Sequence, residues 1–111
     1  MIHSTTVRSM KSAIDTYKDK NIILIFGGKN KSGDFKFLND ICLKKNVCLG
    51  NLSLEIKDVN LDYKNFALDK CVNYAFKNVE IDDVILFSCG CSSLDLFSNY
   101  KEREKYFDEL I

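Results

Sequence analysis

The chain has 111 residues, of which 46% are hydrophobic and 29% charged. That length supports one hydrophobic core but not two, and the composition is ordinary for a globular protein. The 16 basic and 16 acidic side chains cancel, so charge gives no argument for binding nucleic acid or an anionic membrane. The longest apolar run, Ile22 to Phe26, is too short to cross a bilayer, and the first residues do not resemble a signal peptide. We therefore expect one cytoplasmic domain, residues 1–111.

The first half of the chain predicts a helix, a strand, a loop and a second helix. Apolar side chains at helical spacing run from Val7 to Tyr17, and Ser4, Thr5 and Thr6 precede them as possible caps. The segment from Asn21 to Phe26 is apolar almost throughout, as in a strand buried on both faces of a parallel sheet. A polar, glycine-containing loop follows over Gly27 to Gly33. Asp34 is then predicted to cap a helix. Its apolar face would carry Phe35, Leu38, Ile41 and Cys42.

The second half continues the alternation of strands and helices. Two short strands are predicted over Asn46–Gly50 and Leu52–Ile56, and an apolar strand over Val84–Phe87. Between them lies a helix with one apolar side, formed by Ala67, Cys71, Tyr74 and Ala75. A turn of small residues, Ser88 to Ser93, leads to a last helix from about Asp95. This alternation, without a hairpin signal, predicts an α/β domain with a mostly parallel sheet.

Two of the loops leave an apolar strand and enter a helix, over Gly27–Gly33 and Ser88–Ser93. Ligands of open parallel sheets bind beyond the carboxyl ends of the strands, where helix N-termini favour anions. Lys31 adds a positive charge, Ser93 and its neighbour Ser92 add hydroxyl groups, and Thr5 could join them. This collection favours a small ligand with carboxylate or phosphate groups.

Each of these features also has a purely structural explanation. The glycines suit an ordinary turn, Lys31 a solvated surface and Ser93 a helix cap. The first loop matches neither the GxxxxGK[ST] nor the GxGxxG phosphate-binding pattern. The residues alone therefore leave the choice open between a ligand-binding edge and plain turn chemistry.

The five cysteines raise a separate hypothesis, a redox or metal protein. Three of them lie in stretches of apolar periodicity and are expected to be reduced and buried: Cys42, Cys48 and Cys71. The other two, Cys89 and Cys91, are too few to complete a tetrahedral zinc site and do not form a CxxC motif. His3 is the only histidine. We therefore assign no metal ligand and no catalytic residue.

Taken together, the two loops resemble a known family. The run from Ile23 to Leu38, ILIFGGKNKSGDFKFL, resembles the GGxxKxxDFxxL segment of UDP-N-acetylmuramoyl-alanine–D-glutamate ligases. The run from Val84 to Leu110, VILFSCGCSSLDLFSNYKEREKYFDEL, resembles their VLLSPACASxDxFxNFxxRGxxFxxL segment. The order and spacing of both motifs agree, so the resemblance covers nearly the whole chain.

The resemblance implies a fold and a function. It implies the Rossmann-like C-terminal domain of a cytoplasmic, three-domain, ATP-dependent ligase that adds D-glutamate to UDP-N-acetylmuramoyl-L-alanine during peptidoglycan synthesis. There the amine of D-glutamate attacks an acyl phosphate, and this domain presents the amino acid. Lys31 and Thr5 would hold one glutamate carboxylate; the Ser93 hydroxyl and the backbone N–H of Tyr100 would hold the other.

The chain also departs from the family pattern. Met1 to Thr6 align with Asp-Ser-Lys-Ala-Thr-Asn, so His3 stands in place of the lysine, while Thr5 is retained. The glycine of the arginine-glycine pair is replaced by Glu104. The ATP-binding loop, magnesium-binding residues and UDP-sugar domain are not recognised in these residues. We expect this chain to bind no cofactor, and ATP and magnesium to bind in the complete enzyme. We also expect the chain to be a fragment of such an enzyme or to work with a separate partner chain. The alternative is a non-catalytic small-molecule-binding or interaction module on the same fold.

Overall fold

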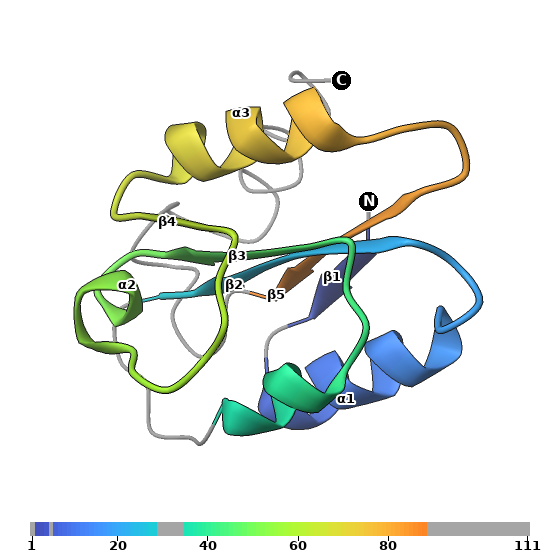
Figure 1. Ribbon diagram of the computed structural model, residues 1–111, viewed down its shortest axis with the longest axis horizontal. Helices are drawn as coiled ribbons and strands as arrows, with labels where there is room; N and C mark the ends of the chain where they lie inside the picture. The colour runs from blue at the N-terminus through green and yellow to red at the C-terminus, as the bar shows by residue number, and fades with distance from the viewer. Residues whose placement is uncertain (1, 5, 29–34, 89–111) are drawn as a thin grey trace.

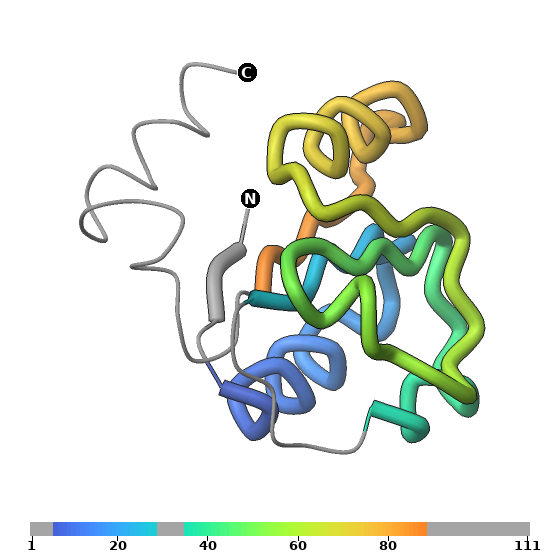
Figure 2. The backbone as a smooth tube through the Cα atoms, turned by 90° about the vertical axis from the view of Figure 1, so that its left-hand side faces the viewer, coloured from blue at the N-terminus to red at the C-terminus, as the bar shows by residue number. Residues whose placement is uncertain are grey.

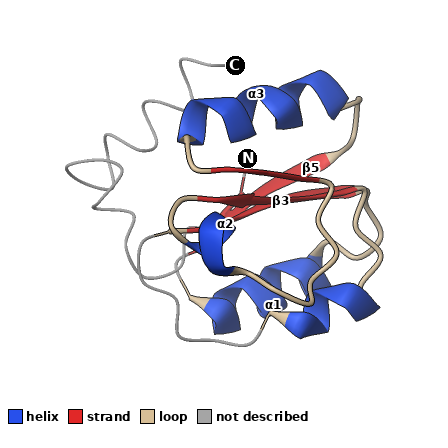
Figure 3. Ribbon diagram, turned by 60° about the vertical axis from the view of Figure 1, so that its left-hand side comes forward, coloured by secondary structure: helices blue, strands red, loops and turns tan. Residues whose placement is uncertain are grey.

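The computed structural model describes residues 2–4, 6–28 and 35–88, and for residues 2–4 it describes only the backbone. These residues form a five-stranded sheet in the order β1-β5-β2-β3-β4, in which every neighbouring pair is parallel. The strands are β1 (Ile2–Ser4), β2 (Ile22–Gly27), β3 (Lys45–Leu49), β4 (Tyr63–Asn65) and β5 (Val84–Ser88). Helix α1 (Val7–Thr16) covers one face and α3 (Leu68–Asn78) the other, as Figures 1 and 3 show. The predicted Rossmann-like α/β fold is confirmed.

The apolar run of β2 explains why the sheet is covered on both faces. All six residues of β2 are buried. Ile23 and Ile25 pack in the cluster that faces α3, whereas Leu24 and Phe26 pack in the cluster that faces α1. Successive side chains of a strand point to opposite faces, so a continuous apolar run requires a helix on each side. The predicted central strand is confirmed.

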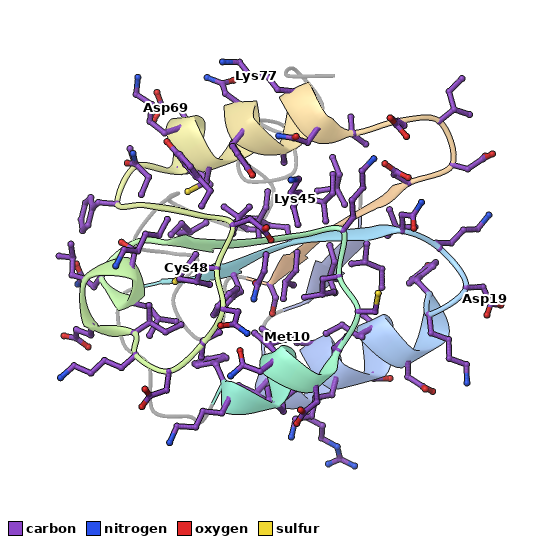
Figure 4. The ribbon with its side chains drawn as sticks, in the orientation of Figure 1. Met10, Asp19, Lys45, Cys48, Asp69 and Lys77 are labelled. Carbon is purple, nitrogen blue, oxygen red and sulfur yellow. The ribbon has the colours of Figure 1, made fainter. Side chains whose placement is uncertain are left out.

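Both predicted long helices form around their apolar stripes. Helix α1 buries Met10 and Ile14, and Figure 4 labels Met10 between α1 and the sheet. Helix α3 buries Cys71, Val72 and Ala75. Figure 4 shows Asp69 and Lys77 on the side of α3 that points away from the sheet. An amphipathic stripe thus decides which side of each helix meets the sheet.

The predicted strand over Leu52–Ile56 is wrong, because Leu52–Glu55 is a short helix, α2. Leu52 and Ser53 are buried while Leu54 is 74% exposed, so the alternation of leucines does not correspond to two faces of a strand. Two of its backbone hydrogen bonds reach outside the helix, from Leu52 N–H to the Gly28 carbonyl (3.2 Å) and from Ser53 N–H to the Gly50 carbonyl (3.1 Å). These contacts, one with the distant Gly28 and one with Gly50 in the left-handed region, outweigh the strand-like alternation of the local sequence.

The helix predicted after Asp34 is shorter and tighter than expected. Residues Lys36–Asp40 form a 3₁₀ helix, η1, with hydrogen bonds between residues three apart, such as Leu38 N–H to the Phe35 carbonyl at 3.0 Å. Leu38 and Phe35 are buried as predicted, but Cys42 lies beyond the helix and is exposed, contrary to the prediction. Asp34 lies outside the described residues.

Two short strands were not anticipated from the sequence, β1 and β4, which form the two edges of the sheet. Ser4, considered above as a helix cap, belongs to β1. Each of these strands has three residues, too few for an alternating pattern to stand out. The last helix predicted from about Asp95 lies outside the described residues.

Candidate functional site

The candidate site is the edge of the sheet formed by the carboxyl ends of β1, β5 and β2, which are neighbours in that order. Ser88 at the end of β5 is in register with Ser4 of β1 on one side and with Phe26 of β2 on the other. Figure 2 looks onto this edge, with the end of β5 (orange) beside the end of β2 (cyan). Three strand ends far apart in the sequence therefore meet at one place.

The four predicted ligand residues all follow these strand ends along the chain. In the sequence, Thr5 comes directly after β1, Lys31 follows β2, and Ser93 and Tyr100 follow β5. All four lie outside the described residues, so their side chains are not placed. The structure does bring together the three strands that precede these residues along the chain.

The end of β2 approaches the end of β3 so closely that only glycine fits. A β-carbon on Gly27 would lie 2.1 Å from the carbonyl oxygen of Leu49, and the φ angle of Gly27 is +141°. Gly50, with φ at +72°, packs in turn against the backbone of Gly28. Because left-handed backbone and close approach both favour glycine, the GG pair of the first motif has a structural role here. Turn chemistry therefore accounts for these glycines without a ligand.

Helix α1 begins directly after β1 and closes its own first turn. The Thr6 hydroxyl accepts the Ser9 N–H at 3.0 Å, and the Ser9 hydroxyl accepts the Thr6 N–H at 3.1 Å. This is a reciprocal capping box. The Thr6 hydroxyl is therefore engaged by the first turn of the helix.

Sequence reasoning did not single out Ser88 as a site residue. Its side chain is fully buried, and within the described part of the chain its hydroxyl oxygen has no hydrogen-bond partner. A buried polar group without a partner is rare and calls for an explanation. The sequence signal was a single serine at the end of an apolar strand, which also fits an ordinary strand-to-turn boundary.

A cavity of about 160 Å³ lies away from this edge, beside the amino end of β3. Its lining combines apolar and polar side chains, among them Leu38, Ile41, Asn46 and Asp62. Asn46 is 4% exposed; its amide N–H donates to the Asn60 carbonyl at 3.0 Å, whereas its amide oxygen has no partner among the described residues. Asp62 accepts the backbone N–H of Asn46 at 2.7 Å. The sequence did not predict this cavity, because its walls come from three separate segments.

The described cysteines give no support to a redox or metal site. Cys48 and Cys71 are buried as predicted. Burial raises the pKa of the Cys71 thiol to about 12, so the reactive thiolate is suppressed. Within the described ranges, no group of three or more histidine, cysteine, aspartate or glutamate side chains could hold a metal ion. Cys89 and Cys91 lie outside the described residues.

A structural ion pair lies at the amino ends of the strands, opposite the carboxyl ends that form the candidate site. Lys44 precedes β3 and Asp83 precedes β5, and the Lys44 Nζ lies 2.5 Å from the Asp83 Oδ2 and 3.5 Å from the Glu80 Oε2. The hydrogen bond from Lys44 lowers the pKa of the Asp83 carboxyl and raises the pKa of the Lys44 ammonium. Each group thus holds the other in its charged form.

No helix in the described part is long and apolar enough to cross a membrane.

Comparison with known proteins finds several relatives that share one name. A UDP-N-acetylmuramoylalanine–D-glutamate ligase of Aquifex aeolicus is 37% identical over 97% of this chain, which covers 28% of that ligase. The ligases of the same name from Bdellovibrio bacteriovorus and Campylobacter jejuni are 32% and 34% identical, again over 97% of the chain, which covers 25% and 29% of them. The chain thus spans about a quarter of the length of these curated relatives. No family model and no solved structure matches it.

Proposed function

Because this chain is a domain related over nearly its whole length to one part of the UDP-N-acetylmuramoylalanine–D-glutamate ligases, we propose that it presents D-glutamate for amide-bond formation. The observation that carries the proposal is that three strands meet at one edge of the sheet: β1, which precedes Thr5, and β2 and β5, with which the two family motifs begin. In parallel sheets this is the edge where ligands bind.

The chemistry of D-glutamate suits the residues proposed for this edge. Its two carboxylates need cationic, hydroxyl or N–H donors, and hydrogen bonds to ionised groups are the stronger ones. Lys31 and Thr5 bind one carboxylate, and the Ser93 hydroxyl and the Tyr100 backbone N–H bind the other. Two anchored carboxylates leave the amine as the free end of the molecule, in a fixed direction.

The contribution of this domain to the reaction is therefore orientation. It holds the amine of D-glutamate toward the activated carboxyl group of UDP-N-acetylmuramoyl-L-alanine. ATP, with magnesium, supplies the acyl phosphate on the remaining domains of the ligase, whether these belong to the same chain or to a separate one. Holding a nucleophile at the attack geometry lowers the entropic part of the barrier. No residue of this chain is assigned a catalytic role.

The proposal is tested by titrating isotopically labelled protein with D-glutamate and following amide chemical shifts, with L-glutamate as the control ligand. We expect shifts at Thr5, Lys31, Ser93 and Tyr100 and at the strand ends beside them, with a preference for the D isomer. Lys31→Met should abolish them. Lys77→Met is the matched control, because Lys77 lies on the side of α3 that faces away from the sheet. Folded protein that responds to neither isomer would refute the proposal.

A second candidate function, a small-molecule-binding module, is favoured by the cavity beside Asn46. Within the described ranges the amide oxygen of Asn46 has no partner, and both this oxygen and the carboxylate of Asp62 are hydrogen-bond acceptors. The cavity therefore suits a compact donor such as a primary ammonium group. Titration with propylammonium separates the two functions. Shifts confined to residues around Asn46, with no response to D-glutamate, would favour the module over the ligase domain.

A further inference from the structure

The cavity beside Asn46 is lined by residues that the structure describes, and it reaches from the core to the surface. Its inner wall is apolar and buried or half-buried: Leu38, Ile41 and Leu43. Its mouth is formed by three exposed residues: Asn39, Asn60 and Asp62. The volume of about 160 Å³ is several times the roughly 10–15 Å³ that one water requires. A small solute can therefore enter from solvent.

Strand register places the Asn46 side chain among these lining residues. Asn46 is in register with Leu24 of β2, and Leu24 packs in the cluster that faces α1. Because paired residues of neighbouring strands share a face of the sheet, the Asn46 side chain lies on the α1 side as well. The three apolar lining residues pack in the same cluster. The buried amide of Asn46 is thus part of the inner end of the cavity.

The polar groups of the cavity are acceptors that still need a donor. The Asn46 amide N–H donates to the Asn60 carbonyl at 3.0 Å, whereas its amide oxygen has no partner within the described ranges. The Asn39 amide N–H is also engaged, with the Asp58 carbonyl at 2.7 Å. Asp62 accepts the backbone N–H of Asn46 at 2.7 Å, and a carboxylate has capacity for about three more hydrogen bonds. The cavity therefore offers a negative charge and acceptor oxygens beside an apolar wall.

The lysines next to Asn46 in the sequence do not supply that donor. Lys45 is in register with Ile23, which packs in the cluster that faces α3, and Figure 4 shows Lys45 on that side of the sheet. Lys44 is paired with Asp83 at 2.5 Å. Among the described residues that line the cavity, none is a lysine, an arginine or a histidine. A cation must therefore come from outside.

We propose that this cavity binds a short aliphatic ammonium ion, at a site separate from the edge assigned to D-glutamate. The ammonium group donates to the Asp62 carboxylate and the Asn46 amide oxygen, and the hydrocarbon part packs against the apolar wall. Hydrogen bonds between ionised groups are about twice as strong as neutral ones. Asn46 lies near the amino end of β3, whereas the D-glutamate edge lies at the carboxyl ends of the strands. The inference rests on the cavity of the second candidate function and extends it, because the two sites can be occupied together.

The test follows amide chemical shifts of the labelled full chain during titration with propylammonium chloride. Sodium propionate is the control ligand, of similar size and opposite charge. We expect saturable shifts around the cavity with propylammonium only. Methylammonium should bind about tenfold more weakly, because it lacks two methylene groups that the apolar wall would bury.

Two matched variants test the role of the carboxylate. Asp62→Asn should weaken propylammonium binding by about tenfold or more, because it removes the charge while keeping an acceptor for the Asn46 N–H. Asp58→Asn is the control, since Asp58 is exposed and nearby but does not line the cavity. Asparagine also tolerates the φ angle of +60° at this position. The affinity of Asp58→Asn should match that of the wild type.

The outcomes separate this inference from the proposed function. Wild-type protein that shows no saturable shifts with propylammonium, or equal shifts with propionate, overturns the inference whatever the variants do. Equal weakening by Asp58→Asn and Asp62→Asn assigns the effect to general electrostatics and also overturns it. Competition between D-glutamate and propylammonium overturns the separation of the sites. Binding of propylammonium without binding of D-glutamate refutes the ligase proposal and leaves the cavity site standing.

Discussion

Replacing Gly27 with alanine puts a methyl group into a position that the backbone of β3 already occupies. The added β-carbon would lie 2.1 Å from the Leu49 carbonyl oxygen, whereas ordinary contact begins at 3.4 Å. The two strands must therefore separate by more than an ångström at the point where Gly27 pairs with Leu49. That movement also removes the hydrogen bond from Gly28 N–H to the Leu49 carbonyl, which is 3.4 Å long.

The expected cost of Gly27→Ala combines three effects. A residue with a β-carbon in the sparsely populated backbone region of Gly27 costs about 1–3 kcal/mol, and the lost hydrogen bond adds about 1 kcal/mol. With the forced separation of the strands, we expect a loss of about 3–5 kcal/mol, a large part of a typical domain stability of about 5–15 kcal/mol. Gly50→Ala is the matched variant. Its φ angle of +72° lies in the left-handed region and its β-carbon would sit 3.0 Å from the Gly28 carbonyl oxygen, so we expect about 1–2 kcal/mol.

Urea denaturation followed by circular dichroism measures both variants. The midpoint should fall for each, with the slope unchanged, and Gly27→Ala should fall further. Gly27→Ala within 1 kcal/mol of the wild type, or less destabilised than Gly50→Ala, would refute the close approach of β2 and β3 described here.

Three further predictions concern the cap, the ion pair and the thiols. Thr6→Ala should lower the free energy of unfolding by about 1 kcal/mol by removing the α1 cap, without changing D-glutamate affinity; an unchanged stability would contradict the capping box. The lowered pKa of Asp83 means that its pairing with Lys44 stabilises the fold above the unfolded-state pKa of the carboxyl and is lost as pH falls through the folded-state value. Lys44→Met should therefore flatten the acid side of a stability–pH curve, and a curve parallel to the wild type would contradict the pairing. At pH 8 a thiol reagent should modify exposed Cys42 and leave Cys71, with its pKa of about 12, unmodified until the protein unfolds; labelling of folded protein at Cys71, detected by mass spectrometry, would contradict its burial.

The sequence predicts well the elements in which one local cause dominates. The apolar run of β2 requires burial on both faces and is found as the central strand. The stripes of α1 and α3 require one buried side each, and the helices bury those sides against opposite faces of the sheet. The family resemblance, based on two motifs, agrees with the relatives found over 97% of the chain.

The predictions fail where a distant contact outweighs the local pattern. Leu52–Glu55 looks like a strand from its leucines, yet a hydrogen bond to the Gly28 carbonyl and the left-handed backbone at Gly50 make it a helical turn. Cys42 fits the apolar period of the preceding helix, yet that helix ends at Asp40 and leaves the thiol exposed. Strands β1 and β4 are too short to produce a pattern and exist because neighbouring strands pair with them.

The candidate site divides in the same way. The sequence by itself determined the residue types, a lysine, two hydroxyl side chains and an aromatic residue within two recognisable motifs, because motifs are local runs of the chain. Only the tertiary structure decided that β5 lies between β1 and β2, so that segments starting after Ser4, Gly27 and Ser88 leave from one edge. It also revealed the buried hydroxyl of Ser88. The physical reason is that strand order and burial depend on pairing and packing between distant segments, for which no local pattern carries a signal.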